Sequence, residues 1–530
     1  MKRGFTLVEL MAVIIILSLL VILAAPPILE KLKKTEKDVD AASLALIESA
    51  IDLYIDDNDD TYPNINGSTY CITFQQLVND GKLKPPVLNA KTGEEIDLNT
   101  LIEVKIINNN LNVSINNDCI LYVNADLSGA AIPELSDGMI PIKWDGTNWV
   151  KADLYQKWYD YAAKEWANIV LVTEATRNTY KSASAGTIIN EADVLAYLVW
   201  IPRYRYKLFN VEALSVSPQA IEIVFEDKNI TKSNGSTNGT WLTHPAFTFG
   251  TSEVNGIWVG KFETTGDATT PTVKPNVASL TSQNVSTQFT TSQKFNTETT
   301  YGTTSDFNSH MMKSMEWGSV IYLSHSQYGK NSEIFINPSN SHITGRGGNT
   351  VSQSGTTDSS GSASSTLYSY DGKQCNTKTG YVCTGTSQSI YGMASSTTGN
   401  IYGIYDMSGG SLEYVMGAQY NSDNTTINVS SSGFVQTTID SVDMAKYINK
   451  YTYGTTQNDQ TAYNRRQLGD ATGETRGWYD DYAGFVYFTV PWSVFGGFYN
   501  STTLAGGFAF YNHLGGAFSN YSFRVVQLKQ

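Results

Sequence analysis

The chain has 530 residues, enough for three or four domains of about 150 residues each. Its 36 Lys and Arg residues against 50 Asp and Glu residues give a net charge of −14, which disfavours direct nucleic-acid binding because such surfaces are basic. Charged residues make up 16% and aromatic residues 12% of the chain, which excludes overall disorder and favours β-rich structure in an extracellular medium.

Residues 5–25 form an apolar run of 21 residues, long enough to cross a bilayer, which needs about 20. Glu9 is out of place in this run, because an acidic side chain there costs about 2.5–3.5 kcal/mol on insertion scales. A free α-amine would neutralise it, and cleavage after Gly4 would create such an amine on Phe5. We therefore expect the amine of one subunit to pair with Glu9 of a neighbour when the helices pack in an assembly.

The segment that carries these residues, GFTLVE, resembles the signal of type IV prepilins and the related pseudopilins. The resemblance implies that a prepilin peptidase cuts after Gly4 and methylates Phe5, and that Glu9 directs assembly with other pilin subunits through the N-terminal helix. It also implies residence in the cytoplasmic membrane, followed by an extracellular pilus or the cell surface. An ordinary signal peptide and a plain membrane anchor are alternatives, but both leave Glu9 unexplained.

A long N-terminal helix is expected over 5–55, after a leader at 1–4, with its transmembrane half at 5–25. Beyond Pro26 and Pro27, Leu and Val recur every seven residues from 32 to 53, which predicts one apolar stripe. An acidic run at 56–60 ends the helix and fits a solvated helix end better than a calcium site.

Residues 56–132 predict a small β head. The alternating segments 101–106 and 112–115 are typical of strands, and the Asn-rich residues between them are typical of a hairpin turn.

Four cysteines allow three disulfide pairings. We favour the two local pairs, Cys71 with Cys119 and Cys375 with Cys383, because thiols outside the cytoplasm most often form disulfides.

Residues 133–184 contain Trp144, Trp149, Trp158 and Trp166 in short strand-like segments. This spacing predicts a separate β-meander spacer whose Trp rings form its core, and sugar stacking on those rings is the alternative.

Residues 185–530 are expected to form one large domain. Apolar segments predict two strands and a helix, and two stretches dense in Thr, Ser, Gly and Asn predict long loops or insertions. The strands are expected at 195–206 and 257–263, the helix at 311–322, and the insertions at 264–306 and 345–400.

The segment 399–415, GNIYGIYDMSGGSLEYV, predicts a strand, a Gly-Gly turn and a second strand. It resembles a signature of the formylglycine-generating (sulfatase-modifying factor) superfamily, a variant of the C-type lectin fold, and 495–499 and 522–526 match later family segments in order. The resemblance implies a C-type-lectin-like domain. The enzymes of that family hold copper with a late Cys pair, whereas no Cys follows Cys383, so we expect no enzyme activity, cofactor or metal site.

Aromatic and small hydrogen-bonding residues alternate in Gly-rich segments near the C-terminus, a composition typical of binding surfaces. The alternative is that Phe508, Phe510 and Phe518 simply belong to the core. Lectin-fold proteins diversified by retroelements are similar at this place, by analogy. The candidate binding residues are Phe498, Tyr499, Asn500, Tyr511, Asn512, His513, Asn520 and Tyr521.

The sequence thus predicts an α+β protein with a long pilin helix, a small β head, an aromatic β spacer and a C-terminal lectin-like domain. About 400 residues follow the head, and such bulk fits a tip or low-copy position better than a repeating lattice. We expect a minor or tip type IV pilin with an adhesin domain for surface, cell or glycan binding, whose ligand is an extracellular glycan or protein. The alternatives are a pseudopilin of a secretion or DNA-uptake system and a membrane-anchored surface enzyme.

Overall fold

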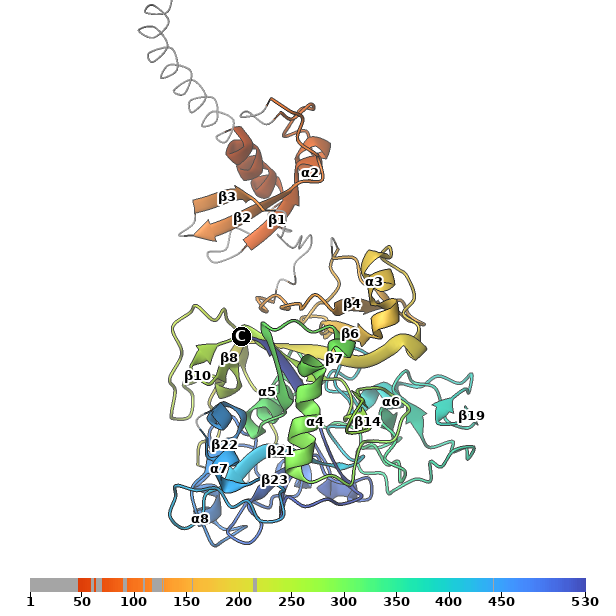
Figure 1. Cartoon of the computed structure of the whole chain (residues 1–530), viewed down its shortest axis with the longest axis vertical. Coiled ribbons are helices and arrows are strands. Elements are labelled where there is room, and N and C mark those ends of the chain that lie inside the picture. Colours follow the sequence, from red (N-terminus) through yellow and green to blue (C-terminus); the bar gives the residue numbers. More distant parts are fainter. Residues whose placement is uncertain are drawn as a thin grey trace, which may run out of the picture. The chain divides into compact units, whose positions relative to one another are not determined.

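The computed structural model describes residues 46–58, 62, 69–88, 93–107, 110–116, 126, 128–154, 156–212, 217–441 and 443–530 (Figure 1). The chain divides into two compact units. Unit 1 comprises Met1–Ala125 with Leu154–Lys157, and unit 2 comprises Asp126–Asp153 with Trp158–Gln530. Gly4, Phe5, Glu9 and the predicted membrane span at 5–25 lie outside the described residues. No helix within the described ranges combines the length and the apolarity that crossing a membrane requires.

Unit 1 contains a helix at 46–57, which ends within the acidic run, and a three-stranded antiparallel sheet in the order β1-β2-β3. Strands β2 (Leu101–Ile107) and β3 (Asn110–Ile115) form the predicted hairpin. The core of this unit joins Ile51 and Ile55 of the helix to side chains of the sheet such as Ile102 and Val104. The sheet covers the face of the helix that carries Ala50, Ile51, Tyr54 and Ile55. Leu46 and Leu53, which the predicted seven-residue repeat places in the apolar stripe, are exposed, so the prediction of the covered face was wrong here.

A capping box explains why helix α2 (Phe74–Asn79) begins where strand β1 (Thr69–Thr73) ends. The Thr73 side chain accepts a hydrogen bond from the backbone N–H of Gln76 at 3.1 Å, and the Gln76 side chain accepts one from the Thr73 N–H at 2.7 Å. Cys71 lies buried in β1, whereas its predicted partner Cys119 lies outside the described residues, so that pairing stays a prediction.

Unit 2 is built on a seven-stranded antiparallel sheet in the order β16-β26-β13-β7-β6-β4-β5. The C-terminal strand lies inside this sheet, between β16 and β13, so the end of the chain closes the core. The strands are β4 (Met139–Trp144), β5 (Trp149–Lys151), β6 (Asn168–Val172), β7 (Val194–Pro202), β13 (Gly256–Gly260), β16 (Phe307–Met311) and β26 (Val525–Lys529).

The segment 133–184 differs from the predicted separate spacer, because its strands belong to this large sheet. Strand β6 pairs with β7 along Asn168–Val172, and every residue of β6 is buried. The buried backbone N–H and C=O groups of β6 need hydrogen-bond partners on both sides of the strand. A short separate meander would leave one side unpaired, whereas pairing with β7 supplies those partners. Trp149, Trp158 and Trp166 are buried, as the core interpretation predicts, and Trp144 is half-buried.

The polar stretch 264–306 is not only a loop, since it contains the 13-residue helix α4 (Val285–Thr297). Asn284 caps this helix by accepting a hydrogen bond from the Thr287 N–H at 2.9 Å. The prediction of a loop was wrong here because the buried face of the helix mixes Phe289 and Phe295 with polar side chains such as Ser292. The buried and exposed faces therefore differ little in hydrophobicity, and the helical pattern is weak in the sequence.

Helix α5 (Ser314–Ser324) confirms the predicted helix, although the first residues of the predicted range, 311–313, lie before its start and Met311 closes β16. Every residue of α5 is buried. A helix that is buried all round belongs to the centre of a domain, so α5 is a core element of unit 2.

A second sheet has the order β22-β21-β23-β24, and β25 also pairs with β21. The predicted strand after the Gly-Gly turn is β21, and the turn itself has left-handed glycines at 409 and 410. Residues 399–410 form no strand, in contrast to the prediction, because their buried backbone follows turns. The strands are β21 (Leu412–Gln419), β22 (Asn449–Tyr451), β23 (Trp492–Phe495), β24 (Phe510–His513) and β25 (Tyr521–Phe523).

Shorter elements complete unit 2. The helices are α3 (Glu174–Ser182), α6 (Ile390–Ala394), α7 (Gln436–Ile439) and α8 (Gln460–Tyr463), with 3-10 turns η1 (Glu191–Asp193), η2 (Pro245–Phe247), η3 (Thr299–Tyr301), η4 (Asp443–Tyr447), η5 (Trp478–Asp480) and η6 (Thr502–Leu504). The strands are β8 (Tyr204–Lys207), β9 (Ile223–Phe225), β10 (Trp241–Thr243), β11 (Thr248–Phe249), β12 (Ser252–Glu253), β14 (Thr265–Gly266), β15 (Pro271–Thr272), β17 (Arg346–Gly347), β18 (Tyr368–Ser369), β19 (Lys378–Thr379) and β20 (Val382–Cys383). Helices and mostly antiparallel sheets together agree with the α+β class.

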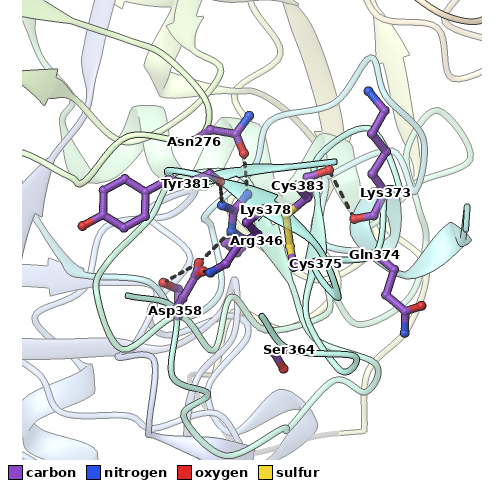
Figure 2. The surroundings of a disulfide bond; sticks show 12 residues. Asn276, Arg346, Asp358, Ser364, Lys373, Gln374, Cys375, Lys378, Tyr381 and Cys383 are labelled. Atoms are coloured by element: carbon purple, nitrogen blue, oxygen red, sulfur yellow. Dashed lines mark hydrogen bonds and ion pairs between the residues drawn. A yellow bond between two sulfur atoms is a disulfide. The ribbon is translucent and has the colours of Figure 1, made fainter. Parts of the chain in front are cut away.

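The predicted disulfide between Cys375 and Cys383 is confirmed, and it closes the hairpin of β19 and β20 (Figure 2). Beside it, the Asp358 carboxylate forms an ion pair with Arg346, whose Nε lies 2.7 Å from Asp358 Oδ2. The same carboxylate also forms an ion pair with Lys378. All three of these charged side chains are buried. The disulfide and this buried charge cluster tie segments of the polar insertion 345–400 to one another, and Arg346 also donates a hydrogen bond to Asn276 outside the insertion.

Candidate functional site

Seven of the eight candidate binding residues are half-buried and Asn500 is exposed, so none belongs to the closed core. They lie on β24, at the start of β25 or directly before it, and in the segment that follows β23. Six of the eight belong to two ring clusters and one stacked pair, and Asn512 and Asn520 lie beside them in the sequence. Phe508 and Phe510 are buried, as the core interpretation predicts, whereas Phe518 is 40% exposed.

The first cluster, called here the β24–β25 cluster, consists of Tyr414, His513, Phe518 and Tyr521. The His513 ring lies 4.5 Å from that of Phe518 and 4.6 Å from that of Tyr521, measured between centroids. The Tyr414 hydroxyl and His513 Nδ1 are 2.6 Å apart, which fixes the imidazole. Burial lowers the pKa of His513, so the ring is neutral near pH 7.

The second cluster, called here the 498–500 cluster, consists of His342, Phe498, Tyr499 and Asn500. The rings of Phe498 and Tyr499 lie 4.1 Å apart, and His342 lies 5.3 Å from Tyr499. The Asn500 side chain accepts hydrogen bonds from the Ser354 hydroxyl at 3.1 Å and from the Gly355 N–H at 3.2 Å. The cluster is therefore tied to the polar insertion 345–400.

One short backbone segment, 410–412, links the two clusters. The Gly410 carbonyl accepts the Tyr499 N–H at 3.1 Å and lies 3.2 Å from His342 Nδ1. Two residues later, the Leu412 N–H donates to the Asn520 carbonyl at 3.0 Å. The Gly-Gly turn thus positions both aromatic clusters next to each other.

Tyr511 and Asn512 have polar groups that the protein itself uses. The Tyr511 ring stacks on Tyr482 at 4.4 Å, and its hydroxyl donates to the Leu504 carbonyl at 2.9 Å. The Asn512 amide donates to the Phe485 carbonyl at 2.9 Å. These two residues therefore offer apolar area more than free hydrogen-bonding groups.

Three other candidates have side-chain polar groups that no other described residue uses, namely Tyr499, Asn520 and Tyr521. Within the described part of the chain, neither the two hydroxyls nor the Asn520 side-chain amide forms a hydrogen bond to protein. Exposed aromatic rings with free polar tips are the usual means by which binding surfaces hold sugars and proteins. Among the eight candidates, these three side chains have polar tips without a protein partner in the described part of the chain.

Sequence reasoning missed His342, Tyr414 and Tyr482 as members of this surface. His342 and Tyr414 lie far along the chain from the segment 494–522, and the pairing of β21 with β25 and the Gly410 contacts bring them into it, whereas Tyr482 lies shortly before that segment and stacks on Tyr511. No local signal in the sequence marks them.

A buried ion pair supports the site from below. Arg524, between β25 and β26, forms an ion pair with Glu413 of β21, with Nε 3.1 Å from one carboxylate oxygen. Burial raises the Glu413 pKa to about 7, and the charge of Arg524 opposes that rise. The pair joins the two sheets of unit 2 and is enclosed by protein, so its role is structural.

The chain's five His residues do not converge in the structure. They occur on different elements, and within the residues that the structure describes no group of three or more His, Cys, Asp or Glu side chains is arranged to hold a metal ion. His310 forms an ion pair with Glu316, and His244 packs among aromatic rings.

Comparison with known proteins identifies the N-terminal motif. Residues 1–25 match the family model described as the prokaryotic N-terminal methylation motif. A stretch of 65 residues is 37% identical to the type II secretion system core protein G of Escherichia coli (strain K12). This stretch covers 12% of the chain and 44% of that protein, so the chain spans less than half the length of this curated relative. The N-terminus is thus a prepilin-type methylation signal like those of type IV pilins and pseudopilins.

Proposed function

We propose that this chain is a minor or tip subunit of a type IV pilus that carries an adhesive C-terminal unit. The observation that carries the proposal is the prepilin-type methylation motif at 1–25, together with Glu9 inside the apolar run. The prepilin peptidase removes 1–4, the methylated amine of Phe5 pairs with Glu9 of a neighbouring subunit, and the N-terminal helix joins the filament. The protein is held in the cytoplasmic membrane before assembly and reaches the cell surface afterwards.

The proposed ligand-binding surface is that formed by the two aromatic clusters of unit 2. Its support is the set of half-buried rings with free polar groups at Tyr499, Asn520 and Tyr521. We propose a C-type-lectin-like fold for this unit and an extracellular glycan or protein as its ligand. The proposal assigns the chain no catalytic step and no cofactor.

A second candidate function is that of a pseudopilin in a secretion system. The observation that favours it is the 37% identity to a type II secretion system core protein. In that function the large unit 2 would contact secreted cargo at the tip of a short pseudopilus. Deletion of the chain would then abolish secretion without the loss of any surface fibre.

The first test is mass spectrometry of the mature protein. We expect an N-methylated Phe5 at its start, and the intact leader when the prepilin peptidase is deleted. The variant Glu9→Ala should be processed but absent from sheared filaments, because the neighbouring amine loses its partner. Glu30→Ala, which removes a carboxylate outside the apolar run, is the matched control. An unprocessed Met1 in wild-type cells would overturn the proposal.

The second test addresses adhesion. The variants Tyr499→Phe and Tyr521→Phe each remove one free hydroxyl, and we expect roughly two- to tenfold weaker binding of the full chain to its ligand on a glycan or cell-surface array. Tyr453→Phe, on a different loop, is the control and should bind normally. If neither variant changes binding, these two hydroxyls are not ligand contacts.

A further inference from the structure

A small acidic hollow lies in unit 2, and none of the eight candidate binding residues lines it. Its wall includes Glu333, Asp481, His325, Tyr479 and Phe508, from segments far apart in the chain. Its enclosed volume is about 10 Å³. This is room for roughly one group the size of a water molecule, so the hollow admits only the tip of a ligand, such as a single ammonium group.

Asp481 is the central group, because it is buried and incompletely satisfied. Its side chain is 4% exposed, and one carboxylate oxygen, Oδ2, accepts the Phe508 N–H at 3.0 Å. The other oxygen, Oδ1, is buried with no hydrogen-bond donor. A Cβ at Gly506 would lie 2.1 Å from this carboxylate, so glycine there lets the carboxylate pack closely over the backbone.

The hollow is lined by carboxyl groups. Glu333 and Asp481 both line it, and Asp480 is adjacent in sequence. The cation that acts on Glu333, Lys330, directs its ammonium to the carbonyls of Glu333 and Ala394. Among the described residues no Lys or Arg forms an ion pair with either lining carboxyl group, so neither group is held in a salt bridge within the protein.

The remaining walls are aromatic. The Tyr479 hydroxyl lies 3.1 Å from His325 Nε2, and the Tyr479 and Phe508 rings lie 6.4 Å apart in a stacked arrangement. Burial lowers the His325 pKa to about 4, so this ring is neutral and brings no positive charge. Carboxylates beside aromatic faces are the two groups that proteins use to hold organic cations.

We propose that this hollow binds the ammonium head of a protonated primary amine, with Asp481 Oδ1 and the Glu333 carboxylate accepting its N–H groups. The proposal goes beyond the adhesive function and does not depend on it. A hard divalent cation fits less well, because it needs more oxygen ligands than this hollow provides. A primary amine could come from a lysine side chain or from an ethanolamine head group, and the two probes below separate these sources.

Binding should strengthen as the pH rises from 5.5 to 8. Burial raises the pKa of Glu333 to about 7, so this carboxyl gains charge over this range, and burial also raises the pKa of Asp481 well above its ordinary value. The other titratable groups that line the hollow are His325 and Tyr479, and Lys330 and Asp480 act electrostatically on Glu333. Of these, His325 with its pKa of about 4 stays neutral throughout.

The test is a ligand-observed NMR titration of the full chain in detergent micelles at pH 7.5. The probes are ethanolamine and Nα-acetyl-lysine amide, each paired with its N-acetylated neutral form. We expect at least one amine to bind and its acetylated form not to bind. The stronger of the two amines identifies the source, and Ca²⁺ is titrated separately as a competitor.

Two variants keep the test decisive. Asp481→Asn and Glu333→Gln should each weaken amine binding at least about tenfold, because each removes a charge-assisted hydrogen bond. Asp443→Asn, on the exposed turn η4, is the control. Glu333 is only half-buried, so its variant is informative even if Asp481→Asn fails to fold. Equal binding of an amine and its acetylated form, unchanged binding by both variants, or stronger competition by Ca²⁺ than by either amine would overturn the proposal.

Discussion

Single buried titratable side chains in unit 2 make the stability of this protein depend on pH. His244 is fully buried among aromatic rings, and its Nδ1 accepts the Ala246 N–H at 3.2 Å. Burial lowers the His244 pKa to about 3, against 6.5 for a free histidine, and a contact with the Gly469 backbone offsets this only in part. The folded protein therefore holds a neutral ring at a pH where the unfolded chain binds a proton.

The sign of the effect follows from this difference. Below pH 6.5 the unfolded state binds a proton at His244 that the folded state does not bind, so the contribution of this residue to the free energy of unfolding should fall by up to about 1.4 kcal/mol per pH unit towards pH 4. Denaturant unfolding followed by Trp fluorescence measures it. His244→Asn keeps an N-cap acceptor without the titration, so its slope against pH should be shallower than that of the wild type. Equal slopes would show that His244 does not contribute.

At the scale of elements, helix α4 shows how a polar sequence builds a core element. Phe295 is fully buried, with its ring 4.7 Å from that of Tyr301, and the Ser309 hydroxyl of β16 donates to the Ser292 carbonyl at 2.7 Å. These contacts fix α4 against the edge of the seven-stranded sheet. The segment therefore contributes to the stability of the fold, although its composition is typical of a loop.

Truncation of this helix tests its role. Phe295→Ala should lower the free energy of unfolding by about 3–5 kcal/mol, as large-to-small changes in cores do. Thr290→Ala, on the exposed face of the same helix, should change it by no more than about 0.5 kcal/mol. Thermal or denaturant unfolding of both variants provides the comparison. A small effect of both substitutions would show that α4 is not a core element.

At the scale of the whole molecule, the two units have separate hydrophobic cores. The core of unit 1 contains only side chains of its own helix, sheet and connections. All ten Trp residues lie between 144 and 492, within unit 2, so Trp fluorescence reports on that unit alone. This distribution allows the stability of each unit to be measured in the presence of the other.

We expect Ile102→Ala to destabilise unit 1 by about 2–5 kcal/mol without moving the Trp transition, since the substitution lies in a core that unit 2 does not share. Hydrogen exchange of 101–106 should accelerate in this variant. Ile169→Ala, in the buried strand β6 of unit 2, should instead shift the Trp transition. A shift of that transition by Ile102→Ala would mean that the units unfold as one.

The sequence alone determined the features that depend on local pattern. The motif around Glu9 was recognisable because a charged residue in an apolar run has few explanations, and the matched methylation motif confirms it. Three further features could be predicted from the sequence because each is encoded within a few residues. They are the hairpin of β2 and β3, the disulfide of Cys375 and Cys383, and the Gly-Gly turn.

Only the tertiary structure decided which distant segments meet. The pairing of β6 with β7 placed the expected spacer in the main sheet, and β21 with β25 brought Tyr414 beside Tyr521. The hollow at Asp481 likewise joins residues more than a hundred positions apart. Strand partners and pocket walls are set by packing over the whole unit, and the burial pattern of one segment does not specify which other segment will cover it.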